Sequence, residues 1–263
     1  RPPLDVDAVI KAITTIQEET NKQSIYTEKG EVKIKSPSPI LLVVLGDLHI
    51  GNQATDHKKT LEIMKTIRDT PNTFAVFNGD LVDNLFVFRK GGAEEAMTAE
   101  MQGMIAMQFM SELDDMGKVI SVATGNHDGF VDNFYRTFSR LKAPLYYNWG
   151  DTDISLGGLM YRLAQFHEFT MGNSTMSHTL RELKYLEMRS PNADIVIGNH
   201  THRKVIEMVL INGVYRVLGE GGTMKIKDTF QVGHGNARFG QFDYCGISVL
   251  LFPDQKKMIP FYH

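Results

Sequence analysis

From Ile40 onward, apolar runs of strand length alternate with helix-length amphipathic patterns, and this alternation constrains the fold more than any other feature. Three such runs end at Gly46, Gly79 and Gly125, and helical patterns lie between them near residues 56–69 and 96–116. Strand, helix and strand in this order predict buried parallel strands joined by helices. We therefore expect an α/β fold.

After Pro144 the pattern changes to strands, with one helical pattern near residues 177–189. The strand-like runs occupy residues 145–148, 153–156, 159–166, 194–198, 204–211, 214–219 and 246–252. This part of the chain is expected to form a second sheet packed on the first.

The first 39 residues differ from the rest. Apolar residues recur at helical spacing from Val6 to Ile16, behind Asp5 or Asp7 as a cap, and the SPSP turn ends at Pro39. We predict an N-terminal helical extension over residues 1–39 and a main domain over residues 40–263.

The composition fits one such domain with an extension, since the chain has 263 residues, 42% of them hydrophobic. No apolar run approaches the roughly 20 residues of a membrane span, and no signal-peptide pattern is present, so we expect no membrane association. The single cysteine, Cys245, excludes an internal disulfide and favours the cytoplasm. Because the net charge is −3, binding to nucleic acid would need a local basic surface.

Five of the apolar runs end in short polar motifs. They are GDLH at 46–49, GDLVD at 79–83, GNHD at 125–128, FHE around His167, and GNHTH at 198–202. Ligands of open α/β sheets collect at the carboxyl ends of strands, so the motifs are expected to meet at one edge. The evidence is the order of all five motifs, because any single one of them can arise by chance.

The residue types in these motifs indicate a metal centre. Asp47 and His49 are two residues apart, as are His200 and His202, and in extended backbone such residues project to the same side. Carboxylate oxygens combined with imidazole nitrogens suit Mn, Fe or Zn, whereas Mg and Ca favour oxygen alone. Two divalent cations and two aspartates would leave a charge of about +2, which attracts phosphate.

In their order, the motifs resemble those of the calcineurin-like metallophosphoesterases: DxH, GDxxD, GNH(D/E), an isolated His and GHxH. The resemblance covers roughly residues 40–202, and the last motif departs from it by the presence of Asn199. It implies a four-layer α/β/β/α sandwich with two mixed sheets. It also implies two divalent transition-metal ions, with Mn favoured over Fe or Zn.

The same resemblance implies a role for each motif residue. Asp47, His49 and His202 would bind the first metal, Asn126, His167 and His200 the second, and Asp80 would bridge them. His127 would act as general acid or transition-state stabiliser, oriented by Asp128. Two metals roughly 3.5–4 Å apart activate a water for in-line attack on phosphorus, so no serine or cysteine nucleophile is needed.

Several of these residues have simpler explanations. Asp47 and Asp80 can be helix caps, and Asp83 a cap or a supporting group. His167 can be an ordinary half-buried histidine, and His178 is a rival for its role.

The substrate is less closely specified. GDLHIG at 46–51 resembles the first motif of SbcD-type double-strand-break repair nucleases. Asn84 stands where the phosphoprotein phosphatase branch has arginine, which disfavours a protein phosphatase. Basic residues follow the motifs and can track a phosphate backbone or form ordinary surface: Arg89, Lys90, Arg136, Arg140, Lys142, Arg203 and Lys204.

From these features we predict a metal-dependent DNA nuclease that hydrolyses phosphodiesters, with Asn84, Arg89 and Arg203 contacting the substrate. A phosphodiesterase or phosphomonoesterase of small, nucleotide-type substrates is the alternative, and a catalytically silent scaffold is a third. The methionine-rich helix over 96–116 extends around more than one face, so it either fills the core or also forms a homodimer surface.

Overall fold

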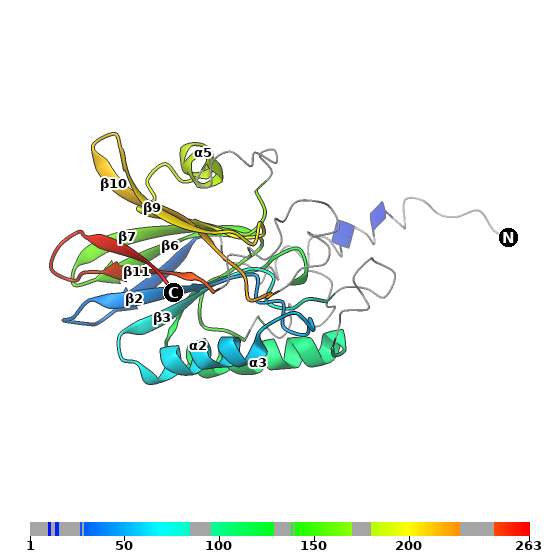
Figure 1. Ribbon diagram of the computed structural model, residues 1–263. Helices are drawn as coiled ribbons and strands as arrows, with labels where there is room; N and C mark the ends of the chain where they lie inside the picture. Colours follow the sequence, from blue (N-terminus) through cyan, green and yellow to red (C-terminus); the bar gives the residue numbers. More distant parts are fainter. Residues whose placement is uncertain are drawn as a thin grey trace.

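Two six-stranded sheets pack face to face, with helices on both outer faces (Figure 1). The computed structural model describes residues 29–84, 96–128, 140–169, 180–226 and 245–263, together with residues 10, 11, 14, 15, 27 and 138. Both sheets contain parallel and antiparallel pairs. The expected four-layer α/β/β/α sandwich with two mixed sheets is therefore confirmed.

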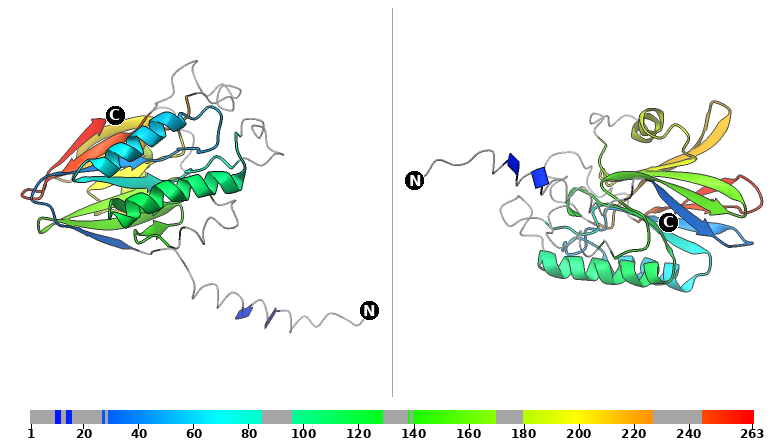
Figure 2. Two further views of the ribbon diagram at one scale, coloured as in Figure 1. Left: turned by 90° about the horizontal axis from the view of Figure 1, so that it is seen from below. Right: turned by 180° about the vertical axis from the view of Figure 1, so that it is seen from behind.

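The first sheet has the strand order β12-β11-β2-β3-β4-β5. Its parallel strands are β2 (Ile40–Leu45), β3 (Thr73–Asn78), β4 (Val119–Ala123) and β5 (Leu145–Tyr146), and antiparallel β11 (Ile247–Leu251) and β12 (Met258–Tyr262) complete it. Helices α2 (His57–Asp69) and α3 (Ala99–Asp115) lie side by side on its outer face (Figure 2). Each begins at a capping side chain, because Asp56 accepts from the Lys59 N–H and Thr98 from the Met101 N–H.

The second sheet has the order β1-β6-β7-β8-β10-β9. Its strands are β1 (Gly30–Ile34), β6 (Trp149–Leu156), β7 (Leu159–Phe166), β8 (Ile195–Gly198), β9 (Lys204–Ile211) and β10 (Val214–Gly221). Helix α5 (Leu180–Met188) covers its outer face, where Tyr185 and Leu186 pack against Phe166 and Val196. Both sheets point the ends of their central strands toward the same edge of the molecule (Figure 1).

Strand β2 shows why the central strands are apolar throughout. Val43 and Leu45 pack in the cluster beneath α2 and α3, while Leu42 and Val44 pack between the two sheets. A strand covered on both faces needs apolar residues at every position. Strand β1 instead alternates between apolar and polar residues, because only its Val32 and Ile34 face packs against the core between the sheets.

Strand β1 corrects the predicted domain boundary. Residues 30–34 were assigned to the N-terminal extension, but they pair in parallel with β6 and form an edge of the second sheet. The error arose because an edge strand with one polar face lacks the continuous apolar run by which the others were recognised. Within the expected helix from Val6 to Ile16, the described residues 10, 11, 14 and 15 are helical. No helix among the described residues is long and apolar enough to cross a membrane.

Candidate metal centre

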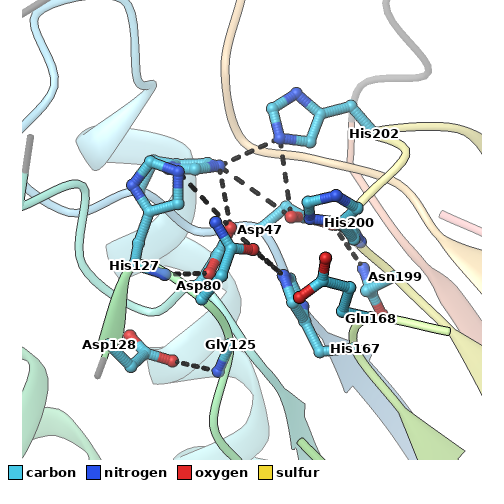
Figure 3. Close-up of polar contacts among 12 residues, drawn as sticks. Asp47, Asp80, Gly125, His127, Asp128, His167, Glu168, Asn199, His200 and His202 are labelled. Atoms are coloured by element: carbon cyan, nitrogen blue, oxygen red, sulfur yellow. Dashed lines mark hydrogen bonds and ion pairs between the residues drawn. The ribbon is translucent and has the colours of Figure 1, made fainter. Parts of the chain in front are cut away.

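The five motifs meet at one edge, where strands of both sheets end (Figure 3). The first sheet contributes the residues that follow β2, β3 and β4, and the second sheet those that follow β7 and β8. The side chains placed there are Asp47, His49, Asp80, Asn126, His167, His200 and His202. All seven predicted metal ligands are thus brought to one region.

Asp47, His49 and His202 form a first cluster, with ligand atoms within 4.8 Å of one another. The two Nε2 atoms of His49 and His202 are 3.0 Å apart. Oδ1 of Asp47 lies 3.5 Å from Nε2 of His202 and 3.8 Å from Nε2 of His49. Three ligand atoms of the types that transition metals prefer therefore face one another.

Asp80, His167 and His200 form a second cluster within the same limit. Oδ2 of Asp80 lies 3.1 Å from Nε2 of His167, and Oδ1 of Asn126 lies 3.2 Å from the same nitrogen. Oδ2 of Asp80 is also 3.9 Å from Nε2 of His49, which belongs to the first cluster. Asp80 consequently occupies the position between the clusters that a bridging carboxylate requires.

One buried oxygen supports a cation at the first cluster. Oδ2 of Asp47 accepts hydrogen bonds from Nδ2 of Asn199 and from the His200 N–H, each 2.9 Å long. Oδ1 is also buried but accepts no hydrogen bond from the residues that the structure describes. A buried carboxylate oxygen without a hydrogen-bond donor is costly, and a metal ion would provide the missing partner.

The protonation states differ between the clusters. Burial, and then the charge of Lys225, lowers the pKa of His49 well below its ordinary value, so this ring is neutral and suited to ligation. Burial alone would also lower the pKa of His167, but the Asp80 carboxylate outweighs it and raises this pKa to about 10. Without metal, the proton on His167 therefore neutralises Asp80, and a metal ion would displace it.

Asp83 supports the first cluster. Its Oδ1 lies 2.9 Å from Nδ1 of His49, so the carboxylate contacts the ring at the nitrogen that does not face His202. The same carboxylate contacts Nζ of Lys225 at 3.1 Å and accepts from Nδ2 of Asn52 at 2.8 Å. The sequence left open whether Asp83 was a cap or a supporting group, and the structure shows the second. Lys225 is not indicated by the sequence, because no motif surrounds this lysine.

His127 and Asp128 lie beside Asp80, but their relation differs from the expected one. The Asp128 carboxylate accepts backbone N–H groups of Gly125, Leu81 and Val82. It thereby holds the two loops together, and burial followed by the nearby Asp80 raises its pKa to about 7. Nδ1 of His127 instead contacts the carbonyl oxygen of Asp83. The orientation of His127 that we assigned to Asp128 is thus provided by a backbone carbonyl.

Arg181, in the first turn of α5, connects the ligand-bearing segments of the second sheet. Its Nη1 donates to the Asn199 carbonyl at 3.2 Å and to Oε1 of Glu220 at 3.1 Å, and its Nη2 to the His167 carbonyl at 3.4 Å. Glu220 in turn accepts from the hydroxyl of Thr201, between the paired histidines. No sequence motif indicates Arg181, because its partners lie in distant segments of the chain.

The backbone of the motifs corrects the predicted geometry. The sequence pattern predicts extended backbone, in which the side chains of each pair, Asp47 with His49 and His200 with His202, project to the same side of the strand. Instead, Asp47, His49, His200 and His202 have φ values of 47°, 45°, 79° and 58°, in the left-handed region that side chains disfavour. Asp80 has a φ of 49°. The pairs converge through tight turns beyond the strand ends, and such strain is typical of functional sites.

The structure describes two of the three predicted substrate-contacting residues, Asn84 and Arg203. Asn84 is buried, and its Nδ2 donates to the His127 carbonyl at 3.3 Å, so its side chain holds the backbone of the third motif. Arg203 is half-buried directly after His202. Arg89 and His178 lie outside the described residues. On α3, Met107 and Met110 are buried, whereas Met101 and Met104 are exposed.

A family model described as calcineurin-like phosphoesterase matches residues 40–204. Among solved structures, the chain is similar to a predicted phosphoesterase from Streptococcus pneumoniae (14% identity, TM-score 0.41, 86% of this chain and 99% of that one). It is also similar to Vacuolar Protein Sorting 29 from Cryptosporidium parvum (14%, 0.45, 86% and 100%) and a putative 5′-nucleotidase from Staphylococcus aureus (13%, 0.46, 81% and 50%). No curated protein matched the sequence. Because the family model spans well over half of the chain and includes all five motifs, the chain belongs to the calcineurin-like phosphoesterase family.

Proposed function

We propose that this protein is a phosphodiesterase dependent on two divalent metal ions, most suitably Mn, and that DNA is its substrate. The observation that carries the proposal is the pair of ligand clusters with Asp80 between them. When bound there, such ions supply an activated water and neutralise charge on the phosphoryl oxygens. Phosphoester hydrolysis in general follows from the family.

The protein prepares the first cluster before any metal binds. The Asp83 carboxylate contacts Nδ1 of His49, and Lys225 balances the charge of that carboxylate. Asp80 accepts from the His127 N–H at 2.9 Å, so the bridging carboxylate and the third motif are held together. Preorganised ligands of this kind avoid the cost of ordering them during the reaction.

His127 is the residue placed to exchange a proton with substrate. A carbonyl only accepts, so the contact with Asp83 assigns the hydrogen to Nδ1 and leaves Nε2 for the substrate. Nε2 lies 3.8 Å from Oδ2 of Asp80, and the side chain is 20% exposed, whereas that of His49 is 1% exposed. A solvent-facing imidazole beside a buried ligand set suits general acid–base catalysis, in which Nε2 takes up a proton from solvent and passes it to the leaving oxygen.

Two features support DNA over a small phosphodiester. GDLHIG at residues 46–51 resembles the first motif of the SbcD-type nucleases, and the basic pair Arg203 and Lys204 directly follows the last ligand. Lysine and arginine beside a phosphate-hydrolysing centre position the backbone of nucleic acids. Arg203 is half-buried and directly follows His202, so it is the basic residue closest in sequence to a candidate ligand.

A substrate panel tests the proposal. Single-stranded DNA, double-stranded DNA, RNA, bis(p-nitrophenyl) phosphate and p-nitrophenyl phosphate are offered with Mn and with excess chelator. We expect cleavage of DNA and of the diester only with metal, and loss of turnover in His127→Ala with Mn binding retained. Full activity in chelator would contradict the two-metal mechanism. Cleavage of the monoester alone would exclude the nuclease.

A further inference from the structure

Asn199, the residue by which the last motif departs from GHxH, is buried behind the first cluster. It follows β8 directly, and its side chain is 1% exposed. Its Nδ2 donates to Oδ2 of Asp47 at 2.9 Å and to the Gly222 carbonyl at 3.2 Å. The departure is therefore not a neutral change in a loop, because it places a donor on a metal ligand (Figure 3).

The amide of Asn199 is itself held in one orientation. Its Oδ1 accepts from Nδ2 of Asn78 at 2.9 Å, so Nδ2 is the atom that faces Asp47. Asn78 ends β3 in the first sheet, and its Nδ2 also lies 3.0 Å from the Phe166 carbonyl in the second. A buried chain of hydrogen bonds thus runs from Asn78 through Asn199 to Asp47 and joins the two sheets.

Two glycines provide the space for this amide. A Cβ on Gly46 would lie 2.3 Å from Cγ of Asn199, and a Cβ on Gly221 would lie 2.5 Å from its Oδ1. Neither glycine is among the residues with positive φ, so backbone conformation does not explain them. Glycine is required at both positions because the side chain of Asn199 occupies the space that a Cβ would need.

The contacts of Asp47 are divided between its two oxygens. Oδ2 accepts from Asn199 and from the His200 N–H, while Oδ1 is left facing Nε2 of His202 and His49. We propose that Asn199 is a positioning residue that fixes the carboxylate rotamer of Asp47 and so presents Oδ1 to the first metal. The inference rests on the proposed two-metal centre. Partners of this kind in other metal sites alter affinity about 10- to 100-fold.

The test separates hydrogen bonding from space filling. Asn199→Leu retains similar bulk but cannot donate, and Asn199→Ala removes both properties. Gln165→Leu is the matched control, because Gln165 is a buried amide between the same two sheets, bonded to Ser121 and the Phe77 carbonyl and to no proposed ligand. Binding of Mn to each purified protein is measured by calorimetry and by electron paramagnetic resonance, without substrate.

We expect two Mn sites in the natural protein, with one of them weakened at least 10-fold in both Asn199 variants and unchanged in Gln165→Leu. Retention of affinity in Asn199→Leu would reduce the role of Asn199 to space filling and overturn the inference. An equal loss in Gln165→Leu would overturn it too, because general loosening between the sheets would then explain the effect. If the natural protein bound no Mn, the two-metal centre itself would be refuted instead.

Discussion

At the scale of single residues, the site combines ligands with backbone conformations that their side chains disfavour. Of the seven proposed ligands, five have positive φ values: Asp47, His49, Asp80, His200 and His202. Each such residue costs on the order of 1–2 kcal/mol in an L-amino acid. The protein accepts this cost because tight turns beyond the strand ends are what bring the ligands together.

A pair of substitutions at His200 measures that strain. Both His200→Gly and His200→Ala delete the ring, but only glycine adopts the φ of 79° without strain. We expect the glycine variant to be more stable than the alanine variant by about 1 kcal/mol, measured by urea unfolding in chelator. In an ordinary helix or strand the order is reversed, so an alanine variant as stable as the glycine variant would contradict this explanation.

Glu182 is a residue whose ionisation opposes folding. It is buried on α5, and burial, followed by the charge of Glu220, raises its pKa well above the ordinary value of 4.5. The folded state therefore retains a proton that the unfolded state releases, and this stabilisation is present below the ordinary pKa and lost as pH rises above it. Arg181 and Glu220 are the charged groups that act on it.

We accordingly expect Glu182→Gln to lose less stability than the natural protein when the pH is raised from about 4.5 to 8. The measurement is the free energy of unfolding in urea at several pH values, in chelator. Glu187→Gln, at an exposed position of the same helix, serves as control and should follow the natural protein. Parallel pH profiles for Glu182→Gln and the natural protein would refute the prediction.

At the scale of elements, α5 does more than cover the second sheet. Arg181 contacts the carbonyls of His167 and Asn199, and its guanidinium also lies 5.4 Å from the centre of the Phe166 ring. A planar guanidinium presents its donors in a fixed fork, whereas an ammonium group is a compact charge on a flexible stem. The helix start therefore sets the relative positions of the ends of β7 and β8.

Substitution of Arg181 should loosen the second cluster. We expect Arg181→Met to weaken Mn binding on the order of 10-fold, with Arg181→Lys intermediate, because methionine keeps the packing but has no donor. Arg189→Met is the control, because Arg189 directly follows the same helix and its guanidinium lies over the Trp149 ring. Titration with Mn checks the series, and unchanged affinity in Arg181→Met would show that Arg181 does not position the ligand segments.

At the scale of the whole molecule, the metal centre joins the two sheets. In the first cluster, Asp47 and His49 follow a strand of the first sheet and His202 follows one of the second. In the second cluster, Asp80 and Asn126 come from the first sheet, and His167 and His200 from the second. A bound cation would thus cross-link two layers that are otherwise held by apolar packing and a few buried amides.

Metal binding should therefore stabilise the whole fold. An ion at 100 times its dissociation constant adds about 2.7 kcal/mol per site if it binds only the folded state. We expect the midpoint of thermal unfolding to rise with Mn concentration and to return on addition of chelator. Asp80→Ala should abolish most of the rise, because Asp80 lies between the clusters. A midpoint independent of Mn would contradict the cross-link.

The α/β class, the two-sheet division and the candidate ligands follow from the amino-acid sequence alone. Those conclusions depend on local patterns: a buried strand is apolar throughout, and the polar residue after it falls at the carboxyl end of the sheet. The apolar pattern does not predict strands β1 and β12, because edge strands need not be apolar on both faces.

The support of the candidate ligands depends on tertiary contacts. Lys225 against Asp83, Arg181 against His167, and Asn199 against Asp47 each join residues from segments far apart along the chain. No local periodicity records such contacts, because they arise when the two sheets pack and bring their strand ends together. The motifs thus identify the candidate ligands, whereas the orientation of these side chains depends on the packing of the two sheets.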